Sequence, residues 1–110
     1  MIQVNVTRDH GGNVLKYQVT GHAQAAEPGE DVVCAAVSVL SQTTILGLYK
    51  VAHIKVSYEI KAGYLVCEMP QELTPEERIK ANMLLETMVL GIKNLMVSYS
   101  EYITLHDKEV

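Results

Sequence analysis

The sequence predicts an α+β fold, a two-layer sandwich in which two helices cover one face of a mainly antiparallel sheet. Five segments alternate apolar and polar residues, as strands with one buried and one solvated face do. Two longer segments, one in the middle of the chain and one in its second half, carry apolar residues at helical spacing. Together these segments give the order ββαββαβ. At 110 residues the chain is expected to form one domain, over residues 1–110.

A hairpin is predicted at the start of the chain. Residues 2–7 alternate, and residues 9–13 include two adjacent glycines that suit a turn. Residues 15–20 alternate again, so the two segments are expected to pair as antiparallel strands. The second strand leads directly to Gly21 and His22, which places the histidine at the end of a strand.

The first helix is predicted over residues 32–49. Pro28 and Gly29 are expected to break regular structure before it, and Asp31 is expected to cap it by accepting from free amides of the first turn. Cys34 would then be about the third helical residue. Unpaired amides and the positive end of the helix dipole favour a thiolate there.

Three polar residues of this helix, Cys34, Ser38 and Ser41, recur at helical spacing and should share one face. Ser38 is one turn from Cys34, where its hydroxyl either bonds the thiolate or bonds a carbonyl of the preceding turn. The second arrangement is the commoner one. The rest of the helix is apolar on most sides, which is typical of a deeply buried helix or of a subunit contact.

A second hairpin is predicted over residues 54–60 and 64–69, joined by a short turn. Cys67 has the same phase as its apolar neighbours Leu65 and Met69, so we expect it in the core. His53, which precedes this hairpin, is expected at the surface.

The second helix is predicted from Pro75 to about Ser98. Thr74 should cap it and form a capping box with Glu77. Gly91 in its middle would allow close packing against the first helix. Residues 102–105 are predicted to form the closing strand, with His106 exposed after it.

Composition restricts the classes of partner. The net charge is −4 without a cluster of lysine or arginine, which disfavours direct nucleic-acid binding and would suit a basic partner such as a ribosomal protein. Apolar runs look too short for a membrane helix, and no secretory signal is visible. Two cysteines in this context indicate reduced thiols and a cytoplasmic location.

Cys34 and His22 form a candidate nucleophile and base, because a thiolate attacks carbonyl carbon and an imidazole can take the thiol proton. The alternatives are an inert buried cysteine and a solvated histidine, both common. Zinc sites need closely spaced ligand pairs, and phosphate loops need a longer glycine pattern. Neither pattern is present, so no metal and no cofactor are expected.

The residues 21–23 (Gly-His-Ala), 31–35 (Asp-Val-Val-Cys-Ala) and Ser38 resemble the ribosomal-processing cysteine protease family (Prp, or YsxB-like). The spacing of histidine and cysteine also matches that family, and the predicted order of strands and helices extends the resemblance over essentially the whole chain. The resemblance implies a thiol protease in which His22 is general base and then general acid, and Cys34 forms a thioester.

The same resemblance implies the substrate. Members of this family remove a short N-terminal extension from large-subunit ribosomal protein number twenty-seven, which supports ribosome assembly. They cut after aromatic residues and before a small one, and a homodimer is expected. The loop 24–30 would shift to admit the peptide, helped by small residues such as Gly21, Ala23 and Gly29.

Roles are also predicted for two further residues. Asp31 would cap its helix or orient His22, and Ser38 would support the site. Two other functions stay open. One is a non-catalytic ribosome-assembly adaptor that only binds the extension, for which Cys34→Ser would leave function intact. The other is a redox-sensing thiol protein, for which Cys67 is the available resolving thiol.

Overall fold

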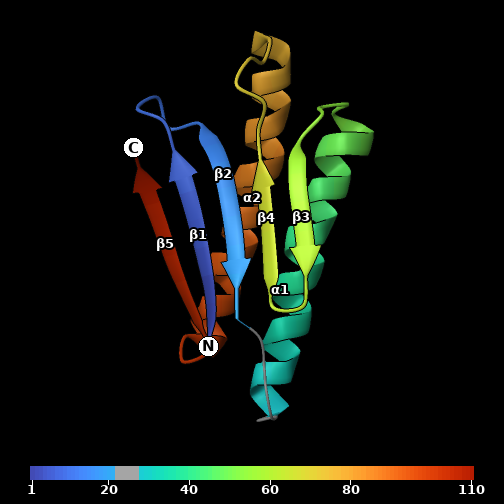
Figure 1. Cartoon of the computed structure of the whole chain (residues 1–110). Helices are drawn as coiled ribbons and strands as arrows, with labels where there is room; N and C mark the ends of the chain where they lie inside the picture. The colour runs from blue at the N-terminus through green and yellow to red at the C-terminus, as the bar shows by residue number, and fades with distance from the viewer. Residues whose placement is uncertain (22–27) are drawn as a thin grey trace.

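In the computed structural model, which describes residues 1–21 and 28–110 (for 28–30 the backbone only), two helices cover one face of a five-stranded sheet (Figure 1). The predicted order ββαββαβ and the two-layer α+β fold are confirmed. The strands are β1 (Ile2–Arg8), β2 (Val14–Thr20), β3 (Ser57–Lys61), β4 (Tyr64–Glu68) and β5 (Ile103–Glu109). The helices are α1 (Pro28–Leu46), which continues as a π-helical segment η1 (Gly47–Val51), and α2 (Pro75–Tyr99).

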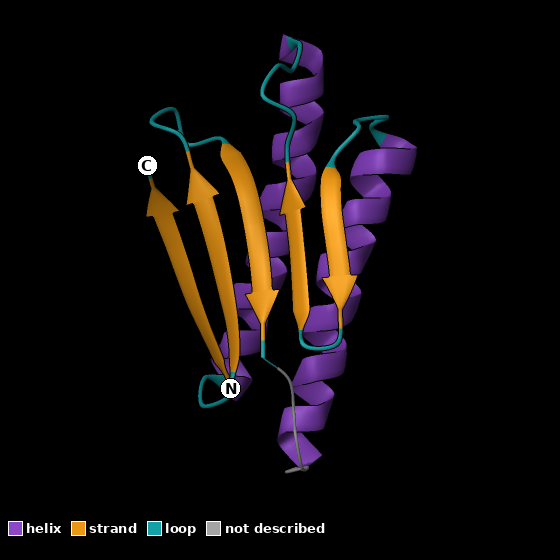
Figure 2. Cartoon of the chain, in the orientation of Figure 1, coloured by secondary structure: helices purple, strands orange, loops and turns teal. Residues whose placement is uncertain are grey.

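The strands lie in the order β3-β4-β2-β1-β5. Every neighbouring pair is antiparallel except β1 with β5, which run parallel from the pair Ile2–Ile103 to the pair Arg8–Glu109. The parallel pair is a consequence of α2, which carries the chain across the helix layer before β5. Figure 2 shows both helices on the same side of the sheet, with the other face uncovered.

The core lies between the sheet and the two helices. Alternate strand residues point into it, as the sequence pattern predicts. Cys67 is fully buried there, as expected. The largest completely buried side chains are Ile2, Val4, Val6, Val14, Tyr17, Val33, Val37, Leu48, Ile54, Leu85, Ile92 and Ile103.

The start of α1 differs from the prediction. The helix begins at Pro28, four residues earlier, because proline fits the first turn of a helix, where its missing N–H would have no partner. Asp31 therefore lies inside the first turn and is exposed, so its prediction as the N-cap is wrong. Gly29 belongs to the helix and not to a loop. Cys34 is the seventh helical residue, not the third.

The end of the first helix is set by His53, which adopts a left-handed conformation with φ of 56°. The amide of Ile54 donates to the Leu48 carbonyl at 2.9 Å, which closes the last turn. His53 is exposed, as predicted, but β3 begins only at Ser57. Residues 54–56 are therefore a connection and not the start of the strand.

The second helix follows its predicted signals closely. Thr74 and Glu77 form the capping box, with the Glu77 amide 3.1 Å from the Thr74 hydroxyl and the Thr74 amide 2.9 Å from the Glu77 carboxylate. Gly91 faces α1, where a Cβ atom would lie 3.0 Å from Leu40. The close helix contact expected at this glycine is confirmed.

One helical segment, Asp31–Val51, is long and apolar enough to cross a membrane by length and composition alone. The expectation that no segment reaches this length is therefore wrong. The reason is that η1 lengthens α1, and that the polar residues in the middle of this segment, at positions 38 and 41–44, are uncharged. A third of the apolar window is buried inside the fold, and Val33, Val37 and Leu48 belong to the core. A helix that packs on a sheet passes the same test.

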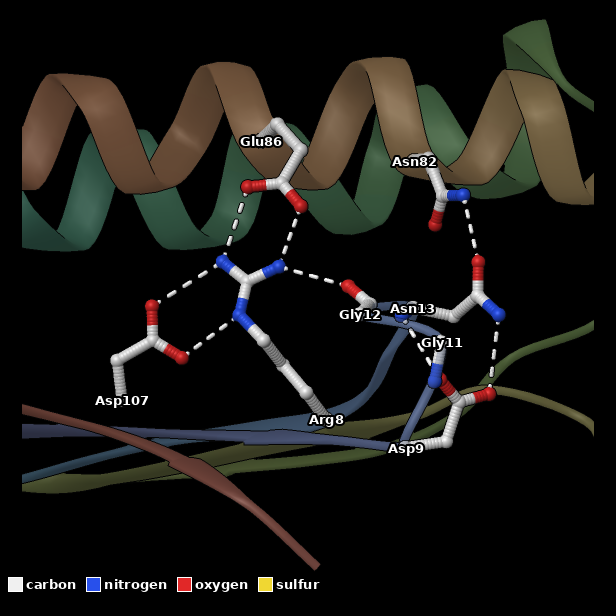
Figure 3. A network of polar contacts seen from close by, with 8 residues as sticks. All are labelled: Arg8, Asp9, Gly11, Gly12, Asn13, Asn82, Glu86 and Asp107. Atoms are coloured by element: carbon white, nitrogen blue, oxygen red, sulfur yellow. Dashed lines mark hydrogen bonds and ion pairs between the residues drawn. The ribbon is translucent and has the colours of Figure 1, made fainter.

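Arg8 holds together the end of the sheet at which β1 and β5 terminate (Figure 3). Its guanidinium makes a double contact with Glu86 on α2 and a second double contact with Asp107 on β5, at 2.7 and 3.1 Å, and donates to the Gly12 carbonyl at 2.9 Å. Hydrogen bonds to both carboxylates raise the pKa of Arg8 further above its ordinary value. Arg8 thus joins β1, β5, α2 and the first turn.

The turn after β1 is organised by Asp9. Its carboxylate accepts from the amides of Gly11 and Asn13, both at 2.9 Å, and from the Asn13 side chain at 3.0 Å. The hydrogen bonds from Asn13 hold the pKa of Asp9 below its usual range. Asn13 in turn accepts from Asn82 on α2 at 2.8 Å, so the turn is fastened to the helix layer (Figure 3).

We predict that Arg8→Met lowers the free energy of unfolding by about 2 kcal/mol, because it removes charge-assisted hydrogen bonds from a largely covered site and leaves two carboxylates without their partner. Chemical denaturation measures this loss. Lys108→Met, at an exposed position on β5, is the matched control and should change stability by less than about 0.5 kcal/mol. Equal stability of the two variants would contradict the role given to Arg8.

Candidate active site

A small cavity of about 60 Å³ lies between α1 and the end of the sheet where β2 ends and β3 turns into β4. It is lined by Val19, Gly21, Cys34, Ser38, Ser41, Gln42, Ile60, Lys61, Gly63, Tyr64 and Leu65. The N-terminal part of α1 projects beyond this end of the sheet (Figure 1). The cavity therefore gathers residues from the strand before His22, from the helix that carries Cys34 and from the second hairpin.

The shared face predicted for Cys34, Ser38 and Ser41 is confirmed, since all three line this cavity. Cys34 is partly exposed. Ser41 is buried, and its hydroxyl donates to the Val37 carbonyl at 2.7 Å, so it is satisfied within the helix. Ser38 is half-buried on the cavity wall, one turn from Cys34.

Gly21 fixes the chain immediately before His22. Its φ of 89° is in the left-handed region, and a Cβ atom would lie 2.2 Å from the Met1 carbonyl oxygen, so no other residue fits here. The Gly21 amide donates to the Gly63 carbonyl at 3.0 Å. This bond ties the end of β2 to the turn between β3 and β4. Gly21 is thus a structural requirement of the site, and not only a small residue of a loop.

His22 and Ala23 lie outside the described residues, together with residues 24–27. The sequence-predicted pairing of His22 with Cys34 therefore stays a prediction. The structure describes the residues on either side of this segment: Gly21, which is hydrogen-bonded to the second hairpin, and the first turn of α1. Cys34 follows that turn on the same helix, and both Gly21 and Cys34 line one cavity.

A hydrogen bond that the sequence analysis missed joins the two elements on either side of the site. The Tyr17 hydroxyl, from β2, donates to the Ser41 carbonyl on α1 at 2.8 Å. Tyr17 is fully buried, and burial raises the pKa of its phenol well above the ordinary value, so the group stays a donor. A tyrosine at a core position of a strand was the available signal, because a buried hydroxyl needs a partner.

The two cysteines differ in environment. Cys67 has no exposed surface, and burial raises the pKa of its thiol to about 12. At neutral pH it stays protonated and out of reach of solvent. Cys34 is the cysteine that a substrate can approach, which agrees with the sequence-based choice of nucleophile.

The position of Cys34 changes the expected source of its activation. Only the first four amides of a helix lack partners within the helix, and Cys34 is the seventh residue of α1. The predicted activation of the thiol by free amides at the start of the helix is therefore not supported. Activation by a base, for which His22 is the candidate, stays a prediction. Within residues 1–21 and 28–110, no three His, Cys, Asp or Glu side chains come close enough to hold a metal ion.

Comparison with known proteins identifies a family for nearly the whole chain. Residues 1–104 match the family described as cysteine protease Prp. The chain is 33% identical over 103 residues to the ribosomal processing cysteine protease Prp of Bacillus subtilis, which covers 92% of each protein. It is 29% identical to the protein of the same name from Staphylococcus aureus, over 98% of this chain and all of that one.

Solved structures show the same fold. The crystal structure of SMU.848 from Streptococcus mutans superposes with a TM-score of 0.86 at 32% identity, covering all of this chain and 96% of that one. A ribosomal processing protease Prp from S. aureus, crystallised with a substrate peptide, gives a TM-score of 0.86 at 23% identity, covering 98% of this chain and all of that one.

We predict that Tyr17→Phe lowers kcat for peptide cleavage with little change in KM, because the strand before His22 is no longer bonded to the helix that carries Cys34. The loss of one hydrogen bond should cost about 1 kcal/mol of stability. Thr44→Val is the control, since it removes a hydroxyl bond to the Leu40 carbonyl within α1 and leaves the link to β2 intact. If both variants lose stability equally and keep kcat, Tyr17 has only a structural role.

Proposed function

The chain belongs to the cysteine protease Prp family, and from this premise we propose that it is an endopeptidase that removes the N-terminal extension of large-subunit ribosomal protein number twenty-seven. The observation that carries the proposal is the position of Cys34. It is a partly exposed thiol on the wall of a cavity that also contains the residue before His22.

The chemistry proceeds in two steps. His22 takes the proton of Cys34 while the thiolate attacks the carbonyl carbon of the scissile peptide bond. As the C–N bond breaks, the imidazolium gives that proton to the leaving amine, and the acyl group stays on sulfur as a thioester. Water, deprotonated by His22, then attacks the thioester carbonyl. The C–S bond breaks, the imidazolium returns its proton to the sulfur, and the free carboxylic acid and the Cys34 thiol are released.

Two further residues have supporting roles in this proposal. Ser38 lines the cavity one turn from Cys34, where its hydroxyl contacts the part of the substrate that enters the cavity. Asp31 is exposed on the first turn of α1, at the end of the segment that contains His22. From there its carboxylate orients the imidazole, in the way that a third group orients the base of a catalytic pair.

Three observations support the choice of substrate. A similar protein from S. aureus has been crystallised with a substrate peptide, and its relatives are named for ribosomal processing. The net charge of −4 suits a basic ribosomal protein. The cavity beside Cys34 is small, which fits the small residue that follows the cut. We place the enzyme in the cytoplasm, where its thiols stay reduced and its substrate is made.

The redox-sensing alternative is disfavoured by Cys67. A resolving thiol has to reach the oxidised cysteine as a thiolate, and Cys67 is buried with its pKa raised to about 12. The variant Cys34→Ser distinguishes an adaptor from a protease. An adaptor keeps its function in cells with this change, and a protease loses it.

We further propose that two copies associate through the outer side of the helix layer. Val32, Val39 and Leu46 on α1 are spaced by seven residues, as are Met83, Leu90 and Val97 on α2, and all six are more than half exposed. Such spacing keeps each set on one side of its helix. This exposed apolar side explains why α1 and α2 carry more apolar residues than the core uses.

Leu90→Lys should convert a dimer into a monomer, because it places a charge in the centre of this apolar surface. Analytical ultracentrifugation gives the mass of each species. Val110→Lys, which changes an exposed apolar residue at the C-terminus, should leave the mass unchanged. A wild-type protein that is already monomeric at micromolar concentration would contradict the proposed dimer.

The cleavage assay tests the function itself. Purified protein is mixed with the extended ribosomal protein from the same organism, and intact masses are recorded over time. We expect loss of the extension with the wild type and a rate at least about a thousandfold lower with Cys34→Ala and with His22→Ala. Intact substrate after incubation with the wild type, with binding confirmed separately, would favour the adaptor.

A further inference from the structure

We propose that the substrate peptide binds as an added strand along the free edge of β3, and so reaches Cys34 in an extended conformation. This inference rests on the proposed protease function and names the surface that holds the substrate. It draws on three features of β3: the direction of its free backbone groups, the side chains that accompany them, and its continuity with the cavity at Cys34.

The register of the sheet shows which backbone groups of β3 are free. In an antiparallel pair, alternate residues direct their amide and carbonyl toward one neighbour and then toward the other. The Met69 amide donates to the Leu15 carbonyl at 2.9 Å, so the odd-numbered residues of β4 bond toward β2. The even-numbered ones then bond toward β3.

The residues of β3 opposite those even-numbered positions are Ser57, Glu59 and Lys61, and they direct their amides and carbonyls to β4. The remaining two, Tyr58 and Ile60, pair in register with Cys67 and Leu65, and they direct their amides and carbonyls to the outer edge. No strand of the described chain pairs with that edge. It therefore presents two donors and two acceptors at the spacing of an extended peptide.

The side chains at this edge are unlike those of a protected edge strand. Tyr58 and Ile60 are large apolar residues that are 54% and 45% exposed, although they share the phase of the core. The charged residues Glu59 and Lys61 have the opposite phase and pair with each other at 3.2 Å. Apolar side chains beside free backbone groups form a template for another strand.

The opposite edge of the sheet has the usual protection. The second half of β5 reads His-Asp-Lys-Glu over residues 106–109, all of them exposed. Asp107 is also held by Arg8 through two hydrogen bonds. Charges at an edge oppose the addition of a further strand. The β3 edge differs because its outward backbone groups belong to Tyr58 and Ile60, two exposed apolar residues, and we therefore assign the peptide to β3.

The free edge of β3 leads directly to the nucleophile. Ile60 and Lys61, the last two residues of the strand, line the same cavity as Cys34. A peptide paired with Tyr58 and Ile60 continues past this cavity, where its next carbonyl meets the thiol. Backbone pairing holds the chain in register, and the cavity then selects the side chain beside the cut.

Tyr58→Pro tests the proposal, because proline removes the outward amide of residue 58 and leaves the bonds to β4 in place. Tyr58→Ala is the matched control, since it removes the same side chain and keeps the amide. Both are made in the Cys34→Ala background, and their binding of a fluorescent peptide that spans the cleavage site is measured. We expect Kd to rise about five- to tenfold for the proline variant relative to the alanine variant.

Binding without cleavage keeps this test separate from that of the protease function. If the wild type does not cut but the proline variant still binds more weakly, the strand addition stands and the protease proposal fails. Equal affinities of the proline and alanine variants would overturn the strand addition. So would a change in molecular mass on Tyr58→Pro with unchanged peptide affinity, because the edge would then serve a second copy.

A second measurement covers the case in which the proline variant unfolds. Peptides with one N-methylated amide at each successive position are then tested with the Cys34→Ala protein, whose β3 is unchanged. Pairing with a single strand edge predicts that affinity falls at every second methylated position. Affinity that falls equally at all positions, or at none, would overturn the proposal.

Discussion

The hydrogen bond from the Tyr17 hydroxyl to the Ser41 carbonyl connects the strand that leads to His22 with the helix that carries Cys34. A cysteine protease needs a thiol and an imidazole held in register, and the candidates here are Cys34 on α1 and His22, which follows Gly21 in the sequence. Because the bond is buried, water does not compete for it. Because the bond ends at Ser41, which lines the cavity, it joins the cavity wall on α1 to β2.

The two ends of the sheet have different tasks. At one end, Arg8 binds Glu86 and Asp107 and locks the first turn, β5 and α2 into one unit. At the other end, the hydrogen bond of Gly21 joins the end of β2 to the second hairpin, directly before His22 in the sequence.

Much of the fold follows from local patterns in the sequence. The alternation of β1 and β4, the capping box of α2 and the buried position of Cys67 were predicted correctly, because each depends on residues close in sequence. The start of α1 was not, since proline and glycine mark both a loop and the first turn of a helix. Tyr58 and Ile60 are exposed because β3 is an edge strand. The alternation of residues along a strand does not predict the order of the strands in the sheet.

The candidate site was predictable to a similar extent. The common face of Cys34, Ser38 and Ser41 followed from helical spacing, and the resemblance to a family gave the chemistry. The identity of the partner of the Tyr17 hydroxyl and the strict requirement for glycine at position 21 could not be predicted. Both arise from contacts between segments that are far apart in sequence or from the approach of the chain terminus.

We infer that His22, and not the start of the helix, activates Cys34. This inference is tested by the rate of alkylation by iodoacetamide as a function of pH in the Cys67→Ala background, with and without His22→Ala. We expect the protein with His22 to react well below the pH at which a free thiol does, and His22→Ala to move the profile upward toward that of a free thiol. Identical profiles for the two proteins would contradict it.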